Sequence, residues 1–538
     1  MIRKFILPPA SIVCLFALLA SGCLHAQAAA HSTMPRIEKR DGRYALIVDG
    51  APYLMLGAQI NNSSAWPAML PQVWPAIADL HANTVEMPIY WEQFEPTQGH
   101  FDDSVLLTLL EQARQHKVHL VLLWFGTWKN GSPHYTPSWI KLDDARYPLM
   151  IGSDGRTVDS LSPLFPATLD ADRTAFAAFM RDLKAADPQH TAIMVQVENE
   201  SGTWGCVRDF SPTAQKLFDG PVPADLIAGL HKQPGTWQQV FADQADVAFH
   251  AWNVARFVGQ VAAAGKAVYA LPMYANAALA PLDNPKPGTY ESGGPTHNVL
   301  DIWKIAAPAV DILAPDIYTP AYRAYIRYLD LYGRPDNPMF VPETGNQPPY
   351  ARYFFAALGH GAIGFSPFGM DFTRYRNDPV GAPALDKDAL APFALNYQIA
   401  GPMDRELAQL SFEGKLKAVS ESPTDHRQTL DFDAWQAVVS YGMPQFGSGR
   451  EPAGNVLPNG GALIAELAPN EFLVAAIHAR VDFTPQQTGK QRQFVRVEQG
   501  FYHNGIWHFE RIWNGDQTDY GLNFTSVPQV LRVTLATY

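Results

Sequence analysis

Cysteine is scarce in this sequence, with 3 copies among 538 residues. Cys14 and Cys23 lie in or at the end of an apolar N-terminal segment that has the features of a secretion signal. Only Cys206 is therefore certain to remain in the mature chain, and one cysteine excludes an internal disulfide. We interpret Cys206 as a small packing residue, with a reactive thiol as the alternative.

Charge and cofactor motifs are sparse as well. Charged residues make up 17% of the chain and the formal net charge is -12, which argues against a nucleic-acid partner. The 16 histidines show no His-Glu-x-x-His spacing, and the sequence contains neither a phosphate-cradling glycine loop nor a dinucleotide fingerprint. We therefore predict no metal and no cofactor.

Apolar and aromatic residues are plentiful. Hydrophobic residues account for 47% of the sequence and aromatic residues for 12%, including 13 Trp. The length allows one large domain and one smaller domain. Aromatic side chains suit surfaces that stack on sugars, but a large domain also buries many of them in its core, and the composition leaves both interpretations open.

The N-terminus is typical of an export signal. Arg3 and Lys4 provide the positive charge, and residues 12–19 provide an apolar core that is too short for a convincing membrane span. Two cleavage sites compete, the lipoprotein-like Ala20-Ser21-Gly22-Cys23 and the ordinary Ala26-Gln27-Ala28. We expect a signal peptide over 1–28, or a lipoprotein signal over 1–22 with a lipid anchor at Cys23. The protein would then be periplasmic, an outer-membrane lipoprotein, or secreted.

The region that follows repeats one pattern. Apolar strand-like runs alternate with helical periodicity, as in the apolar face formed by Val105, Leu106, Leu109, Leu110 and Ala113. Eight strand–helix units predict an α/β fold, a (β/α)8 TIM barrel over 35–415. The expected strands are 53–58, 84–90, 119–124, 193–197, 267–273, 310–314, 339–342 and 362–366.

From about residue 420 the helical periodicity fades. Short alternating runs follow at 463–467, 471–478, 493–499, 505–513 and 531–536, and His503-Asn504-Gly505 is a strong hairpin signal. We predict a β-sandwich domain over 420–538. It either binds carbohydrate or packs against the barrel and stabilises it.

Two apolar strands end in carboxylates. The run 193–197 leads into Glu198-Asn199-Glu200 before a Ser-Gly turn, and the run 339–342 leads into Glu343 before Gly345. In a parallel barrel both ends lie on the same rim. Two carboxylates facing one cleft are what glycoside hydrolysis requires, so we predict Glu200 as the general acid/base and Glu343 as the nucleophile.

The motif from Gln196 to Glu200 resembles that of glycoside hydrolase family 35, whose usual member is a retaining β-galactosidase. The family's Glu-Asn-Glu-Tyr-Gly reads Glu-Asn-Glu-Ser-Gly here, because Ser201 replaces the tyrosine. A second match runs from Asn83-Thr84-Val85 through Trp91 to Phe94-Glu95-Pro96, Gly99 and Phe101, with Phe94 in place of histidine. Glu343 is a third match. Strand three departs from the family motif, since it continues as Trp124-Phe125-Gly126-Thr127-Trp128-Lys129-Asn130.

The resemblance implies an exo-acting, retaining β-galactosidase of a divergent bacterial branch with a C-terminal β domain. It also implies that the substrate is a terminal β-galactosyl residue of a plant cell-wall glycan such as xyloglucan. Another β-glycosidase on the same barrel, a β-glucosidase or an exo-glucosaminidase, is one alternative. A carbohydrate-binding barrel without turnover is another.

Further residues near the strand ends are candidates for the sugar site. Asn199 is expected to bond the sugar 2-hydroxyl, with a structural turn as the alternative. Glu198 alternates away from Glu200 and is expected to be a buried acid paired with Arg or Lys. Either Tyr318 or Tyr274 is expected to orient Glu343, with plain packing as the alternative for each. The remaining candidates are Tyr90, Trp128 and Asn130 for the terminal sugar, Tyr290 and Glu291 for the aglycone, and Phe368 and Asp371 at strand eight.

Overall fold

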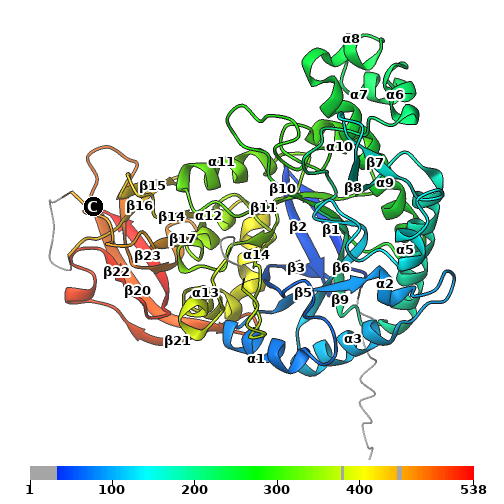
Figure 1. Cartoon of the computed structure of the whole chain (residues 1–538). Helices are drawn as coiled ribbons and strands as arrows, with labels where there is room; N and C mark the ends of the chain where they lie inside the picture. The colour runs from blue at the N-terminus through cyan, green and yellow to red at the C-terminus, as the bar shows by residue number, and fades with distance from the viewer. Residues whose placement is uncertain (1–32, 377–380, 445–450) are drawn as a thin grey trace, which may run out of the picture.

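The computed structural model describes residues 33–376, 381–444 and 451–538 (Figure 1). Its larger part is a closed barrel of eight parallel strands, and its smaller part is a pair of antiparallel sheets at the C-terminal end. The predicted fold class is confirmed. The signal peptide, its two cleavage sites and the lipid anchor at Cys23 concern residues 1–32, which lie outside the described residues. Among the described helices, none is long and apolar enough to cross a membrane.

The barrel strands follow one another around the ring in chain order, and the last strand pairs with the first. Their residues are largely apolar because helices cover the outside of the ring and side chains fill its inside. Since all eight run in parallel, their C-terminal ends form one rim. The strands are β4 (Met55–Gln59), β5 (Thr84–Tyr90), β6 (His119–Lys129), β9 (Ala192–Asn199), β10 (Met273–Ala278), β11 (Ile312–Ile317), β12 (Val341–Thr344) and β13 (Gly364–Pro367).

A helix follows each strand and packs on the outside of the ring (Figure 1). In α3 the whole predicted apolar face is buried, which confirms that periodicity. The eight helices are α1 (Leu70–Leu80), α3 (Ser104–His116), α5 (Pro166–Ala186), α9 (Ala245–Val268), α10 (Leu300–Ala306), α11 (Tyr322–Tyr332), α12 (Tyr353–Gly359) and α13 (Lys387–Ala400).

The fifth strand is not where the sequence pattern suggested. The prediction of 267–273 is wrong, because α9 continues to Val268 and β10 begins at Met273. An apolar run that follows alanine-rich sequence is compatible with helix as well as strand, and here the helix continues. A short helix over residues 237–241 is set apart from α9, because the chain turns at Ala242 with a φ of 50°. The shift carries β10 to Ala278 and brings Asn276 to the rim.

Smaller elements decorate the barrel. The chain turns back at Asp49-Gly50 in a hairpin that belongs to a three-stranded sheet, which packs on α14. Three short helices before α9 project from one side of the barrel (Figure 1). The bounds are β1 (Arg36–Arg40), β2 (Arg43–Val48), β3 (Ala51–Tyr53), α2 (Trp91–Phe94), α4 (Ser138–Lys141), β7 (Leu149–Ile151), β8 (Thr157–Leu161), α6 (Pro212–Phe218), α7 (Ala224–Gly229), α8 (Trp237–Phe241) and α14 (Asp404–Phe412).

The C-terminal part is a sandwich of a six-stranded and a four-stranded sheet. One apolar core that includes Trp435, Phe472 and Val474 joins the two sheets. Asn504 and Gly505 take positive φ in the predicted hairpin. The strands are β14 (Leu416–Ser420), β15 (Arg427–Asp431), β16 (Trp435–Ser440), β17 (Gly461–Ala468), β18 (Glu471–Ile477), β19 (Ala479–Pro485), β20 (Arg492–His503), β21 (Ile506–Ile512), β22 (Leu522–Phe524) and β23 (Val530–Thr537).

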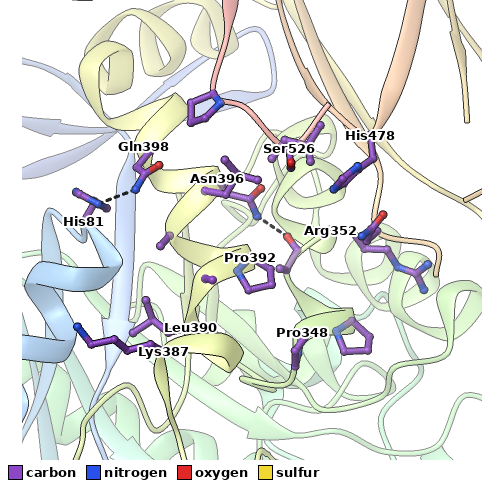
Figure 2. A pocket seen from close by; sticks show the side chains of 18 of the residues that line it. His81, Pro348, Arg352, Lys387, Leu390, Pro392, Asn396, Gln398, His478 and Ser526 are labelled. Carbon is purple, nitrogen blue, oxygen red and sulfur yellow. Dashed lines mark hydrogen bonds between the residues drawn. The ribbon is translucent and has the colours of Figure 1, made fainter. Parts of the chain in front are cut away.

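The sandwich packs closely on the barrel. Gly359 of α12 lies so near β14 that a Cβ there would come within 2.1 Å of the Ala418 carbonyl oxygen. Arg352 Nη1 donates across the junction to the Pro458 carbonyl oxygen (2.6 Å). A cavity of about 780 Å³ lies beside this junction, lined by α1, α13 and loops of the sandwich (Figure 2). Asp79 is the one acidic residue that lines this cavity, and it pairs with Lys387. The cavity therefore lacks the two carboxylates that glycoside hydrolysis needs.

Candidate active site

Glu200 stands at the end of β9, a strand in which every residue is buried. Glu198 and Glu200 both take a positive φ, 62° and 45°, which is uncommon for residues with a side chain. Such backbone conformations cost on the order of 1–3 kcal/mol each and concentrate at functional sites. The Glu200 backbone N–H donates to Asn276 Oδ1 (3.1 Å) and anchors this irregular strand end to β10.

Glu343 of β12 receives four hydrogen bonds from four different strand ends. Its Oε1 accepts from Gln59 Nε2 (2.8 Å), Asn199 Nδ2 (3.3 Å) and Asn276 Nδ2 (3.5 Å). Its Oε2 accepts from the Tyr318 hydroxyl (2.8 Å). Donors that converge on one carboxylate stabilise its negative charge and fix its orientation. The carboxyl group of Glu343 is therefore held in one orientation at the rim.

A third carboxyl group joins the two predicted glutamates. One oxygen each from Glu200, Asp316 and Glu343 lies within 4.8 Å of the others. All three line a cavity of about 590 Å³ at the C-terminal rim of the barrel. The exposed rings of Trp204 and Tyr375 also line this cavity. Among the described residues, these three carboxylates are the one group of His, Cys, Asp or Glu side chains whose ligand atoms lie close enough together to hold a cation.

The electrostatic environment of Glu200 raises its pKa. Burial is the main cause that raises the pKa of Glu200 to about 7, and the charge of Glu343 acts in the same direction. The ammonium group of Lys129 opposes this rise. Lys129 Nζ is itself fixed, since it donates to Asn199 Oδ1 (2.7 Å) and Asn130 Oδ1 (2.5 Å). Near neutral pH a fraction of Glu200 therefore carries a proton that it can give, beside the oriented carboxyl group of Glu343.

Several predicted residues do lie at the cavity. Asn130, Tyr318 and Phe368 line it, and the ring of Phe368 packs edge-on against that of Tyr318 with centroids 6.4 Å apart. Asn199 lies beside Glu343 and bonds it. Of the two tyrosines considered for orienting Glu343, the hydroxyl on this carboxylate belongs to Tyr318.

Two residues expected to contact the terminal sugar are instead buried behind the wall of the cavity. The Tyr90 ring packs between Trp66 and Tyr135, and its hydroxyl accepts from the Ala65 backbone N–H (3.1 Å). The Trp128 indole N–H donates to the Leu161 carbonyl oxygen (3.2 Å). A strand end has two faces, and the pattern of residue types does not say which face opens to the cavity. The structure assigns both side chains to packing.

Two more expectations are not met, because Tyr274 stands near the start of β10 and Tyr290 lies in the loop after that strand. Tyr274 is buried inside the barrel, where its hydroxyl donates to Glu86 Oε2 (2.9 Å). Tyr290 is also buried, and its hydroxyl accepts from Asn298 Nδ2 (3.2 Å). Neither ring lines the cavity.

Three of the predicted acidic residues form hydrogen bonds within the protein that hold strand ends and loops in place. Glu291 does not contact the cavity but joins the ends of β9 and β10, accepting from the backbone N–H groups of Gly202 (2.5 Å) and Ala278 (2.6 Å). Asp371 accepts from the backbone and side-chain N–H groups of Asn61 (2.8 and 2.9 Å). Glu198 is buried as predicted, but its expected cationic partner is wrong. It accepts from the Trp128 backbone N–H (2.8 Å), and burial together with the adjacent Asp172 holds its pKa well above the usual range.

Residues of the second family-like motif hold the barrel together. Glu95 accepts from the Trp91 indole N–H (2.8 Å) and the Gly99 backbone N–H (2.7 Å), which fixes the loop after β5. The Asn83 side chain accepts from the Leu56 backbone N–H (2.8 Å) and donates to the Leu54 carbonyl oxygen (3.0 Å). Their spacing therefore reflects scaffold geometry and does not place them in the cavity.

Sequence reasoning missed four polar residues that touch the two glutamates or adjust their charge, namely Gln59, Lys129, Asn276 and Asp316. Asp316 had a usable signal, because it follows an apolar strand just as Glu200 and Glu343 do. Asn276 was hidden by the misplaced fifth strand. Gln59 and Lys129 gave no comparable signal, since their role depends on which neighbours the closed barrel brings to them.

The hydroxyl of Tyr318 provides a direct test of the Glu343 environment. We expect Tyr318→Phe to lower kcat/KM on an aryl glycoside substrate by roughly 10- to 100-fold, because a hydrogen bond to a charged group is lost. Tyr328→Phe is the matched control. Tyr328 also lines the cavity, but its hydroxyl donates to the Ala280 carbonyl oxygen (2.9 Å). Equal losses in the two variants would contradict a specific role for Tyr318.

Glu86, inside the barrel, provides a stability test. Burial raises its pKa from 4.5 to about 8. The folded protein therefore holds this proton more tightly than the unfolded chain, so the contribution to stability is complete below pH 4.5 and is lost as the pH rises to about 8. We expect Glu86→Gln to gain stability relative to the wild type across this window, by up to ~1.4 kcal/mol per pH unit. Thermal unfolding between pH 5 and 9 measures it, and a pH-independent difference would contradict the assignment.

The C-terminal region matches the family model described as "Domain of unknown function (DUF5597)" over residues 393–525. The match begins within α13 and ends just after β22. No curated protein matches the sequence.

Solved structures similar to this chain include several glycosidases. A β-galactosidase from the psychrophilic Marinomonas ef1 aligns with 12% identity and a TM-score of 0.49, covering 66% of this chain and 61% of that chain. A β-galactosidase from Bacillus circulans sp. alkalophilus aligns with 11% identity and a TM-score of 0.48, covering 66% and 57%. An exo-β-1,4-mannosidase from Opitutaceae bacterium strain TAV5 aligns with 16% identity and a TM-score of 0.41, covering 68% and 60%. The chain thus spans less than two thirds of the length of each.

Proposed function

We propose that this protein is a retaining β-glycosidase in which Glu200 is the general acid/base and Glu343 the nucleophile. The observation that carries the proposal is the close approach of their carboxylate oxygens, within 4.8 Å, across one cavity. Retaining glycosidases hold their two carboxyl groups roughly 5–5.5 Å apart, whereas inverting enzymes need about 6.5–9.5 Å to admit a water molecule. The separation here supports double displacement.

In the first step Glu343 attacks the anomeric carbon and forms a glycosyl ester, while Glu200 gives its proton to the leaving oxygen. The four donors around Glu343 support this role because they orient the attacking oxygen. The pKa of about 7 for Glu200 supports its role, because a useful fraction of the group is protonated near neutral pH. In the second step the Glu200 carboxylate takes a proton from water, which attacks the ester from the face that the leaving group vacated.

Asn199 is proposed to bond the sugar 2-hydroxyl. Its Nδ2 lies 3.3 Å from Glu343 Oε1, and Lys129 holds its Oδ1, so the amide is both close to the nucleophile and fixed in orientation. A bond to the 2-hydroxyl strengthens as charge develops on the ring. Asn130 and Phe368, which line the same cavity, are proposed to contact the sugar from the sides.

We propose a terminal β-galactosyl residue as the substrate, on the strength of the resemblance to glycoside hydrolase family 35. An exo-acting enzyme that trims a plant cell-wall glycan such as xyloglucan is the specific form of this proposal. The exposed rings of Trp204 and Tyr375 at the cavity support a bulky, partly solvated aglycone, since sugars stack on such rings. We propose in addition that residues 1–28 are an export signal, which would bring the protein to a polymeric substrate outside the cytoplasm.

Proton NMR of an aryl β-galactoside reaction tests sugar and mechanism together. We expect β-galactose to appear first, with the α-anomer following by mutarotation. First appearance of α-galactose would keep the sugar but remove the nucleophile role of Glu343. If no galactose forms, the galactosidase assignment fails, and aryl glucosides and glucosaminides then decide between the related glycosidases.

A further inference from the structure

Asp316 is the one acid at the centre of the site to which the two-glutamate mechanism gives no task. It lies on β11 directly beside Glu343 in the strand register and is 2% exposed. Its Oδ2 accepts from Asn276 Nδ2 (2.7 Å). Its Oδ1 is buried and accepts no hydrogen bond from any described residue, although the Asp316 side chain lies within hydrogen-bonding reach of Glu200.

The charges around Asp316 are almost all of one sign. Burial and the carboxylates of Glu343, Glu200 and Glu291 hold its pKa well above the usual range. The tyrosines that also sense its charge, Tyr274, Tyr318 and Tyr332, carry no positive charge. Two cationic side chains line the same cavity, Lys129 and Arg376, and Lys129 bonds Asn130 and Asn199 instead. Glu200 and Asp316 bring carboxyl oxygens to within 4.8 Å of each other, and two such groups repel when both are ionised, so one of them keeps a proton.

We propose that Asp316 is a positioning residue for the acid/base. It keeps a proton on Oδ1 and donates a hydrogen bond to the Glu200 carboxylate that forms when Glu200 protonates the leaving oxygen. The proton stays on Asp316 throughout, so no bond to it breaks. Asn276 fixes the geometry, because it holds Asp316 Oδ2 with its Nδ2 and the Glu200 backbone N–H with its Oδ1. The inference deepens the proposed function and rests on it.

This role makes Glu200 a stronger acid than burial alone would allow. The hydrogen bond from Asp316 lowers the pKa of Glu200, against the larger effects that raise it. Its benefit should depend on the leaving group. A poor leaving group needs the proton from Glu200 and therefore the support of Asp316, whereas a good leaving group departs without either.

Two substitutions separate hydrogen bonding from packing. Asp316→Asn keeps the shape, since its oxygen can accept from Asn276 while its Nδ2 donates to Glu200. We expect kcat within about threefold of the wild type and an unmoved alkaline limb of kcat/KM. Asp316→Leu removes the donor. We expect kcat on a phenyl β-galactoside to fall roughly 10- to 100-fold and the alkaline limb to rise by about one to two pH units, with a dinitrophenyl β-galactoside little affected.

The matched control is Asp311→Asn, the same change at the opposite end of β11, where Asp311 pairs with Lys266 (2.6 Å) away from the cavity. It should leave the pH profile unchanged. Thermal unfolding shows which variants fold, and Asp316→Ala replaces the leucine variant if that one does not. An unmoved alkaline limb in the donor-free variant, or an asparagine variant as impaired as leucine, overturns the inference. If Glu200→Gln and Glu343→Gln keep full activity, it is the proposed function that fails.

Discussion

Glu343→Gln should lower kcat on an aryl β-galactoside by on the order of 10⁴-fold or more, because an amide cannot form the glycosyl ester. The substitution keeps the size of the side chain. Gln59, Asn199 and Asn276 can still donate to its amide oxygen, and its amide nitrogen can donate to the Tyr318 hydroxyl, so the fold should survive. Substrate binding should survive as well. The expected result is an inactive protein with nearly unchanged affinity for the sugar, measured by steady-state kinetics and by calorimetry.

The smaller variant Glu343→Ala leaves space where an added anion can act. Azide bound in this gap should attack the anomeric carbon from the vacated face and yield an α-galactosyl azide, which NMR identifies. Glu86→Gln is the control, because Glu86 is buried beneath the site and outside the cavity lining. Its activity at pH 6 should stay within about tenfold of the wild type, since Glu86 is already protonated there. If Glu343→Gln and the wild type bind sugar equally and neither hydrolyses it, the protein is a carbohydrate-binding barrel.

Glu200→Gln should lower kcat on substrates with poor leaving groups by roughly 10²- to 10⁴-fold, the range expected when a general acid is removed. In the wild type, kcat/KM should decline as the pH rises through about 7, because burial raises the pKa of Glu200 to that value and the acid form is lost above it. The variant has no proton to lose there, so this limb should disappear. A pH series of initial rates measures both effects.

The leaving group and added azide separate an acid/base role from a structural one. A dinitrophenyl β-galactoside should still form the glycosyl ester in Glu200→Ala, and azide should then release a β-galactosyl azide, the opposite anomer to that from Glu343→Ala. Glu291→Gln is an informative comparison, since Glu291 is buried next to Glu200 but bonds only backbone N–H groups at the strand ends. We expect Glu291→Gln to be less stable than the wild type but to keep the decline of kcat/KM as the pH rises through about 7. A limb that persists in Glu200→Gln would assign the proton to another group.

The repeat of eight strand–helix units could be predicted from the sequence, because each unit shows its own local signal, an apolar run followed by 3.6-residue periodicity. The two glutamates could be found for a related reason. A charged residue at the end of a buried strand conflicts with its surroundings unless it faces a cleft, and a parallel barrel gathers all such ends on one rim. The sandwich hairpin at Asn504-Gly505 was equally local.

The errors arose where the local sequence pattern decides neither the boundary of an element nor the direction of a side chain. An alanine-rich helix running into an apolar segment concealed the start of β10, and with it Asn276. Tyr90 and Trp128 stand near the ends of β5 and β6, Tyr274 stands near the start of β10, and Tyr290 lies in the loop after it, yet all four rings are buried. A single residue of register decides which face of a strand meets the cavity, and that register is set by neighbouring strands rather than by the strand itself.

The sequence by itself thus determined the barrel, the sandwich and the two glutamates, because each follows from the order of residues along a short segment. Only the tertiary structure decided that four donors from four strands converge on Glu343, that Lys129 adjusts Glu200, and that Asp316 stands beside both. These residues are far apart in the chain and become neighbours only when the eighth strand closes on the first. Charges interact through space, so the protonation of the site is a property of the closed barrel and not of any one motif.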